Sequence, residues 1–251
     1  MKPGRLFGAL ALPILLAHVP DAAEIRVLCM PGVSAAMEEI GPLFEAATGY
    51  KLSIRYGLPS QSREALDSGA FDFVALDSDA VDDLVKQNKV IRATRADIAR
   101  MGIGVAVRAG APKPDIRTVE AFKRALLNAR SISFTKDSAA GIYIAKMMER
   151  LGIAEEMRPK TKLMGGGGQN PRAVAAGEVE LGLSVISDIL PVTGVELVGP
   201  FPPELQHYVV ITGAVGTTAK QPEAARALIR FLTAPTATLI LKAKGLEPGP
   251  R

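Results

Sequence analysis

Strand-like segments alternate with helix-like segments along most of this chain. Three short apolar runs, at residues 25–29, 52–56 and 71–76, are each followed by a stretch whose apolar residues recur every three or four positions. These stretches end near Gly49, Gly69 and Asn88, residues that often terminate helices. The order predicts an α/β protein with parallel strands and helices on both faces of the sheet.

The second half of the chain repeats this order. We expect strands at 101–107, 131–134, 162–164, 180–185 and 208–211, and helices at 119–127, 142–151, 171–177, 222–232 and 235–244. Four prolines, Pro191, Pro200, Pro202 and Pro203, are predicted to mark irregular connections. Ser60 is expected to cap the second helix, and Gly41-Pro42 to kink or restart the first.

The amino-terminal residues have the pattern of an export signal. A basic tip precedes an apolar run, Leu6 to Ala17, that is too short to span a membrane. We therefore expect residues 1–23 to be a signal peptide and the mature protein to be periplasmic; the alternative is a buried amino-terminal helix. Cys29, the one cysteine, lies within a strand pattern and is expected to be buried rather than lipid-attached.

Length and charge limit the possible functions. The 251 residues, 48% of them hydrophobic, can bury a full core and form one large domain or two small ones. The net charge of +4 is mild, the basic residues are scattered and aromatic residues make up only 5%. This composition argues against a nucleic-acid partner and favours small anions weakly.

The stretch Ser138-Ala139-Ala140-Gly141 has the clearest functional pattern in the chain. It follows a predicted strand and opens a predicted helix with small and hydroxyl-bearing residues. The first N–H groups of a helix lack partners within it and favour an anion. An ordinary helix cap is the alternative, but capping alone does not need small residues.

The order of several motifs resembles the molybdate-binding protein family, the substrate-binding components of ABC importers. The motifs are Phe44–Gly49, Ser68–Val74, Ala140–Tyr143, Leu151–Ile153, Ser187-Asp188 and Ala227–Pro235. The resemblance implies a two-lobed type 2 periplasmic binding protein fold, with two doubly wound sheets joined by two crossing strands. It places lobe I at residues 24–104 and 208–251 and lobe II at residues 105–207.

The chain departs from the molybdate-binding pattern at two oxyanion donors. Gly32 stands where the family carries a serine, and Val185 where it carries a tyrosine. A group within the family, the aconitate isomerases, is more similar, through Val107–Gly110, Lys113–Ile116, Val119-Glu120 and Asp137–Ile144. This similarity favours an organic acid over molybdate.

The predicted ligand-binding residues lie in loops that follow the strands. A tricarboxylate is expected to recruit cations, so Arg63, Lys136 and Arg172 are considered, with solvated surface charge as the alternative. The glycine run at 165–168 is either a ligand clamp or a flexible connection. The predicted set is Gly32, Val33, Ser60, Gln61, Ser62, Arg63, Asp77, Ser138, Ala139, Ala140, Tyr143, Gly168, Gln169, Arg172 and Ser187.

Three functions remain after these observations. The first is a monomeric binding protein that holds an organic carboxylate for an ABC permease. The second is an aconitate isomerase, for which Lys136, Tyr143, Asp188 or His207 could move the proton. The third is molybdate or tungstate binding. No cofactor is expected, and no spacing of residues resembles a metal site.

Overall fold

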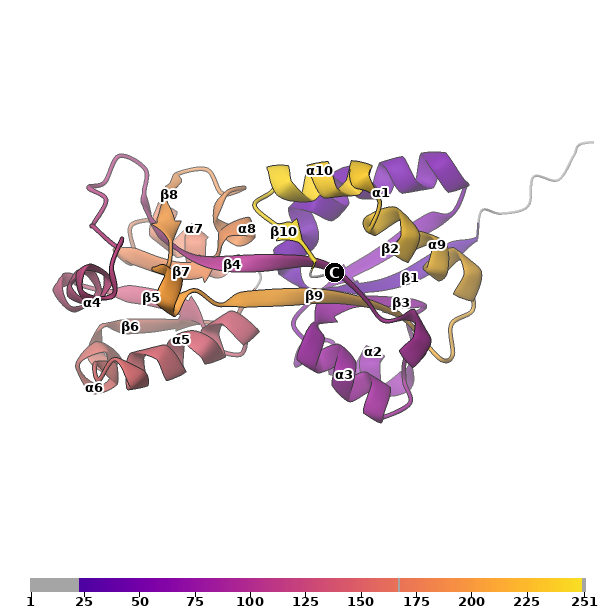
Figure 1. Ribbon diagram of the computed structural model, residues 1–251, viewed down its shortest axis with the longest axis horizontal. Helices are drawn as coiled ribbons and strands as arrows, with labels where there is room; N and C mark the ends of the chain where they lie inside the picture. The colour runs from indigo at the N-terminus through magenta and orange to yellow at the C-terminus, as the bar shows by residue number, and fades with distance from the viewer. Residues whose placement is uncertain (1–22, 167, 250–251) are drawn as a thin grey trace, which may run out of the picture.

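Two α/β lobes are joined by long strands in the computed structural model (Figure 1), which describes residues 23–166 and 168–249. The predicted signal peptide, except for its last residue, lies outside these ranges. The first lobe contains β1 (Glu24–Cys29), α1 (Ser34–Thr48), β2 (Lys51–Tyr56), α2 (Arg63–Ser68), β3 (Phe73–Asp77) and α3 (Ser78–Lys86). The chain returns to it with β9 (Tyr208–Val215), α9 (Pro222–Leu232), α10 (Pro235–Ala243) and β10 (Glu247–Pro248).

The second lobe is built from the middle of the chain. Its elements are α4 (Val119–Asn128), β5 (Ile132–Thr135), α5 (Ala139–Arg150), α6 (Ala154–Met157), β6 (Thr161–Met164), α7 (Gln169–Ala175), β7 (Leu181–Val185), α8 (Ile186–Ile189) and β8 (Val195–Pro200). The long strand β4 (Ala96–Arg108) runs through both lobes. The α/β class and the two-lobed arrangement predicted from the sequence are confirmed.

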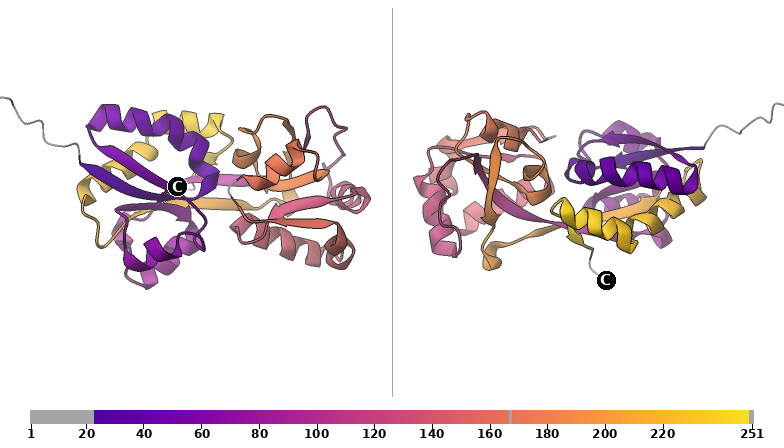
Figure 2. Two further views of the ribbon diagram at one scale, coloured as in Figure 1. Left: turned by 180° about the vertical axis from the view of Figure 1, so that it is seen from behind. Right: turned by 90° about the horizontal axis from the view of Figure 1, so that it is seen from above.

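The strand order shows how the lobes are connected. Hydrogen-bonded strands follow the order β2-β1-β3-β9-β4-β7-β5-β6, with β8 and β10 also paired to β4. Strands β1, β2 and β3 are parallel, as are β5, β6 and β7, whereas β4 and β9 are antiparallel to their neighbours. Both sheets are therefore mixed. The chain passes from the first lobe to the second in β4 and returns through residues 201–207 and β9 (Figure 2).

Helices cover both faces of each sheet. In the first lobe α1, α9 and α10 lie on one face and α2 and α3 on the other (Figure 1). The rings of Phe44 and Phe231 pack edge to face at 5.5 Å in the first core, and Phe122 and Phe201 lie 4.7 Å apart in the second. Each lobe thus has aromatic packing of its own.

One buried ion pair links distant parts of the first lobe. The Asp72 side chain is fully buried and accepts hydrogen bonds from the main-chain N–H and the guanidinium of Arg26, at 2.9–3.0 Å. It also accepts the Lys220 N–H at 2.5 Å. Burial acts to raise the pKa of Asp72, but these hydrogen bonds together outweigh it and lower the pKa. They also connect β1 to the residues that precede α9.

Several local predictions need correction. Helix α2 begins at Arg63 after Ser62, so Ser60 is not its cap. Pro42 lies inside α1, which does not restart there. Residues 195–200, predicted to be irregular, form β8 and pair with β4 between Gly104 and Arg108. The lobe boundaries at 104/105 and 207/208 stay a prediction.

None of the described helices is by itself long and apolar enough to cross a membrane. Only α9 and α10 together reach that length, and they are bent by 64° at their junction. Cys29 is buried as predicted, and burial raises the pKa of its thiol to about 12.

Candidate functional site

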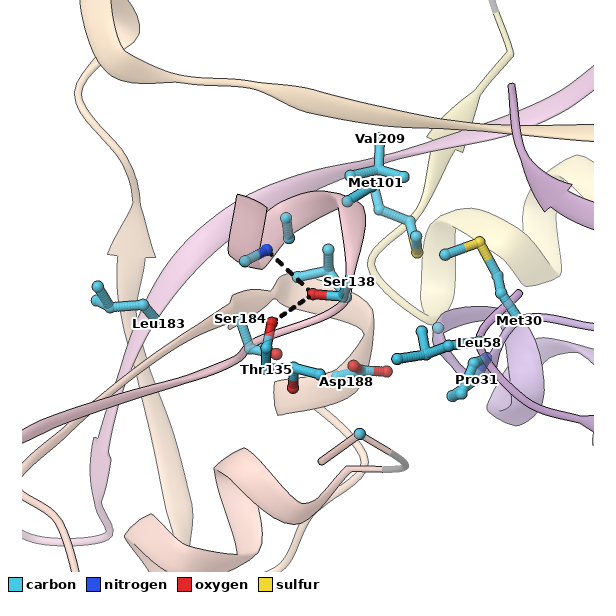
Figure 3. Close-up of a pocket in the computed structure, with 16 residues that line it drawn as sticks. Met30, Pro31, Leu58, Met101, Thr135, Ser138, Leu183, Ser184, Asp188 and Val209 are labelled. Carbon is cyan, nitrogen blue, oxygen red and sulfur yellow. Dashed lines mark hydrogen bonds between the residues drawn. The ribbon is translucent and has the colours of Figure 1, made fainter. Parts of the chain in front are cut away.

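A narrow cleft lies between the lobes and is lined by residues from both (Figure 3). The first lobe contributes Met30, Pro31, Gly32, Leu58, Met101 and Val209. The second contributes Thr135, the 138–141 turn, Gly166, the end of β7 and Asp188. The free volume is about 30 Å³, whereas one bound water needs roughly 10–15 Å³, so the cleft has room for only a few water molecules. A larger solute therefore needs the lobes to separate.

The first turn of α5 opens onto this cleft. Ser138 is extended, with φ −90° and ψ 154°, and its Oγ accepts the Gly141 N–H at 3.0 Å. The same hydroxyl donates to the Thr135 carbonyl at 3.0 Å (Figure 3). Ser138 therefore caps the helix, as one alternative predicted.

Ala139 and Ala140 leave two donors at the cleft. Both residues line it, and their main-chain N–H groups have no hydrogen-bond partner in the described part of the chain. Together with the positive end of the helix dipole, such N–H groups form an anion site. The small side chains leave this end of the helix accessible.

Gly141 fixes the helix against the end of β5. A Cβ atom at this position would lie 1.8 Å from the Thr135 carbonyl oxygen, a distance that no side chain can occupy. Gly32 has a similar role on the opposite wall, because a Cβ there would lie 2.5 Å from the Met101 sulfur. Close packing against the backbone thus requires glycine at position 141, whereas at position 32 a side chain would need the Met101 side chain to move.

Asp188 is the ionisable group of the cleft wall. It follows β7, on the short helix α8, and its carboxyl group points toward Leu58 and Pro31 (Figure 3). Burial raises the pKa of Asp188 to about 6, although the positive charge of Arg172 acts to lower it. The described lining includes no lysine or arginine. Asp188 can therefore gain or lose a proton near neutral pH.

A hydrogen bond closes one side of the cleft. Gln61 Nε2 in the first lobe donates to the Gly165 carbonyl in the second at 3.0 Å. The Gln61 Oε1 accepts the Leu58 N–H at 3.0 Å, which fixes the side chain. Gln169 Oε1 accepts the Gly165 N–H at 3.3 Å. The two predicted glutamines thus hold the same loop, one from each lobe.

The predicted ligand residues are only partly brought together. Gly32, Ser138, Ala139 and Ala140 line the cleft. From the other two predicted loops, Leu58 and Gly166 line it rather than Ser60 and Gly168. Leu58 lies two residues before Ser60 in the chain, and Gly166 lies two residues before Gly168.

Other predicted residues lie behind or away from the cleft. Val33 and Ser62 are buried, and Ser60 and Arg63 line a separate hollow on the first lobe. Asp77 caps α3 by accepting the Ala80 N–H, and Ser187 Oγ donates to the Met101 sulfur at 3.2 Å. Gly168 directly precedes α7, and Arg172 lies on that helix.

Of the proposed proton-transfer residues, Asp188 is in the cleft lining. Tyr143 donates its hydroxyl to the Leu205 carbonyl at 2.8 Å and stacks on His207, with ring centroids 4.4 Å apart. Lys136 is exposed in the loop before α5. Among the described residues, no group of three or more His, Cys, Asp or Glu is arranged to hold a metal ion.

Sequence reasoning missed Thr135, Ser184 and Gly166 as lining residues. Thr135 and Ser184 lie at the carboxyl ends of β5 and β7, where ligands bind in α/β sheets, so strand ends alone could have indicated them.

Comparison with known proteins gives consistent results. A family model described as bacterial extracellular solute-binding protein matches residues 25–247. An aconitate isomerase from Pseudomonas sp is 33% identical, over 99% of this chain and 97% of that protein. The molybdate-binding protein ModA of Azotobacter vinelandii is 28% identical, over 92% of each.

A solved structure shows the shared fold. The periplasmic molybdate-binding protein of Azotobacter vinelandii superposes with a TM-score of 0.76 at 18% identity, covering 90% of this chain and all of that one.

Proposed function

The chain belongs to the family of bacterial extracellular solute-binding proteins, and from this premise we propose that it binds a small organic carboxylate in its inter-lobe cleft. In this proposal the protein is exported to the periplasm and delivers its ligand to an ABC permease. The observation that carries it is the first turn of α5, where the Ala139 and Ala140 N–H groups are unpartnered at the cleft. Two such donors suit the two oxygens of a carboxylate.

An organic acid is favoured over molybdate by the cleft wall. Gly32 and Val185 line the cleft. At the matching positions, the molybdate binders that this chain resembles carry a serine and a tyrosine, whose hydroxyl groups this chain lacks. Apolar side chains, including Leu58 and Met101, form much of the remaining surface and suit the carbon skeleton of an organic acid. The relative with 33% identity is named for aconitate, a tricarboxylic acid.

Binding requires movement of the lobes. Because the free volume is only about 30 Å³, a di- or tricarboxylate enters after the cleft widens. The connections between the lobes, β4 and residues 201–207, are where we place the hinge. Gln206 pairs there with both the N–H and the carbonyl of Ile103, at 3.1 and 3.0 Å.

Calorimetry with the purified mature protein tests the proposal. The ligands are trans-aconitate, cis-aconitate, citrate, succinate, sulfate and molybdate, each at pH 5 and pH 7.5. We expect saturable binding of at least one carboxylate and weaker binding of the two oxyanions. Binding of molybdate alone, or of none of the carboxylates, would overturn the proposal.

A proline substitution isolates the helix donor. Ala139 is the first residue of α5, where proline is tolerated, and Ser138 already has the extended conformation that precedes proline. Ala139→Pro therefore removes one N–H and should weaken carboxylate binding about 10- to 100-fold, as expected for a bond to a charged group.

The matched control for this variant is Val119→Pro. Val119 is also the first residue of a helix, α4, follows an extended residue, Thr118, and does not line the cleft. It should leave affinity unchanged. Equal affinity of the Ala139→Pro and Val119→Pro variants would show that the α5 donor does not hold the ligand.

A second candidate, aconitate isomerase, is favoured by Asp188. A carboxyl group whose pKa is about 6 can both accept and donate a proton near neutral pH, as acid–base catalysis requires. Incubation with trans-aconitate followed by chromatography tests it. Formation of cis-aconitate that is lost in Asp188→Asn supports the enzyme, and tight binding without turnover excludes it.

A further inference from the structure

Asp188 is an unexpected residue for a cleft that binds carboxylates. It is the one ionisable side chain among the described lining residues, and it has no hydrogen-bond partner in the described part of the chain. Its carboxyl group faces the apolar Leu58 and Pro31 across a narrow space (Figure 3). Two ionised carboxylates in contact there would repel each other strongly, since little water separates them.

The elements around Asp188 supply little compensating charge. The turn Pro31–Val33, strand β7 and the first turn of α5 have no charged side chains. In the neighbouring strands, Arg100 of β4 pairs with Glu247, and Glu196 of β8 pairs with Lys113. Arg172, on α7, is the charge that acts on Asp188. One cation cannot neutralise both Asp188 and a polycarboxylate.

We propose that Asp188 makes ligand binding depend on a proton, which is held between its carboxyl group and a carboxyl group of the ligand. The proposal rests on the proposed carboxylate function. The proton comes from solvent and stays as an O–H on one carboxyl group, donating to an oxygen of the other. The α5 N–H groups then bind the remaining ionised oxygens.

This arrangement selects carboxylates against oxyanions of much lower basicity. The conjugate acid of a carboxylate has a pKa close to that of Asp188, so the two groups can share one proton. Sulfate is a much weaker base than a carboxylate and shares the proton poorly, so it meets the charge of the ionised Asp188. Asp188 is thus a specificity residue as well as the candidate acid–base group.

The direct test is proton uptake on binding. Titration calorimetry with trans-aconitate at pH 7.5 is run in phosphate and in Tris, which differ in ionisation enthalpy. Wild type should take up close to one proton for each ligand bound, and Asp188→Asn close to none. The apparent Kd of wild type should rise about tenfold for each pH unit above 6, whereas that of the variant stays flat.

A matched control is Asp137→Asn. Asp137 is exposed, directly precedes Ser138 and does not line the cleft. This variant should take up the same number of protons as wild type. Thermal melting of all three proteins establishes that they are folded. Equal proton uptake by Asp188→Asn and wild type would overturn the role of Asp188.

Sulfate affinity provides a second measurement. Without the Asp188 charge, Asp188→Asn should bind sulfate at least about tenfold more tightly than wild type, since one like-charge contact is removed. Unchanged sulfate affinity would also count against the proposal. If wild type binds none of the carboxylates at pH 5, the proposed function fails. If it binds trans-aconitate without proton uptake, only the proton-sharing role fails.

Discussion

Replacing Asp188 by asparagine should stabilise the ligand-free protein at alkaline pH. Burial in the cleft raises the pKa of this carboxyl group from 3.8 to about 6. A folded-state pKa above the unfolded value means that its contribution to stability is fully present below pH 3.8 and is lost as pH rises through 6. At pH 8 the partly buried carboxylate therefore destabilises the fold.

The magnitude follows from the shift. A difference of roughly two pKa units, at 1.36 kcal/mol each, corresponds to about 3 kcal/mol at pH 8. At pH 4 the folded state is largely protonated and the unfolded state is roughly half ionised, so the difference falls to about 0.5 kcal/mol. Asparagine keeps the size of the side chain and removes the charge. For a protein of this length, about 3 kcal/mol corresponds to a rise in Tm of roughly 6–12 °C.

The assay is thermal or urea unfolding of wild type and Asp188→Asn without ligand, at pH 8 and pH 4. We expect Asp188→Asn to be much more stable to unfolding than wild type at pH 8 and only slightly more stable at pH 4. The control is Asp115→Asn, because Asp115 is exposed and the Arg117 guanidinium lowers its pKa to about 2. That change should give no gain at pH 8. A variant less stable than wild type at pH 8, or a gain independent of pH, would refute the reasoning.

Three other predictions concern packing and the inter-lobe contact. Gly141→Ala should cost at least about 2 kcal/mol in urea unfolding, because its Cβ would clash with Thr135, whereas Gly41→Ala, in α1 with its nearest contact at 3.6 Å, should gain up to about 1 kcal/mol. Equal effects would contradict this. Gln61→Ala should remove the hydrogen bond to Gly165 in the second lobe and weaken carboxylate binding by about 1 kcal/mol. It should also raise the radius of gyration in small-angle scattering. An unchanged radius would argue against a role of Gln61 in closing the cleft. Asp72→Asn should cost about 1.5–3 kcal/mol near neutral pH, since it weakens the charge-assisted hydrogen bonds to Arg26. Because the folded-state pKa of Asp72 is lowered, the difference should shrink as pH falls below 3.8, and a constant difference in urea unfolding from pH 7 to pH 3 would be inconsistent.

Regular elements with strong periodicity were predictable from the sequence. Helix α1 ends at Gly49 in the left-handed conformation, with φ 78°, as its pattern indicated. The turn at Ser138 was recognisable because small residues follow a strand end. By contrast, β8 was missed because prolines and glycines surround residues 195–200, and its partner β4 lies about 90 residues earlier in the chain. Local sequence does not encode such pairing.

The candidate site was predictable at the level of loops but not of side chains. The loops containing Ser60 and Gly168 do reach the cleft, yet they present Leu58 and Gly166 to it. Which residue of a loop faces the partner lobe depends on the backbone of both lobes. Burial likewise raises the pKa of Asp188, and its carboxyl group faces Leu58 and Pro31, which come from the other lobe.

Strand β4 belongs to both lobes, and this has a consequence for how the protein comes apart. Its first half pairs with β9 in one sheet, and its second half pairs with β7 and β8 in the other. Melting of either sheet therefore frees one half of a strand whose other half lies within the remaining sheet. The two halves of the molecule should therefore lose structure in one cooperative transition, because they share this strand and one continuous cluster of buried apolar residues.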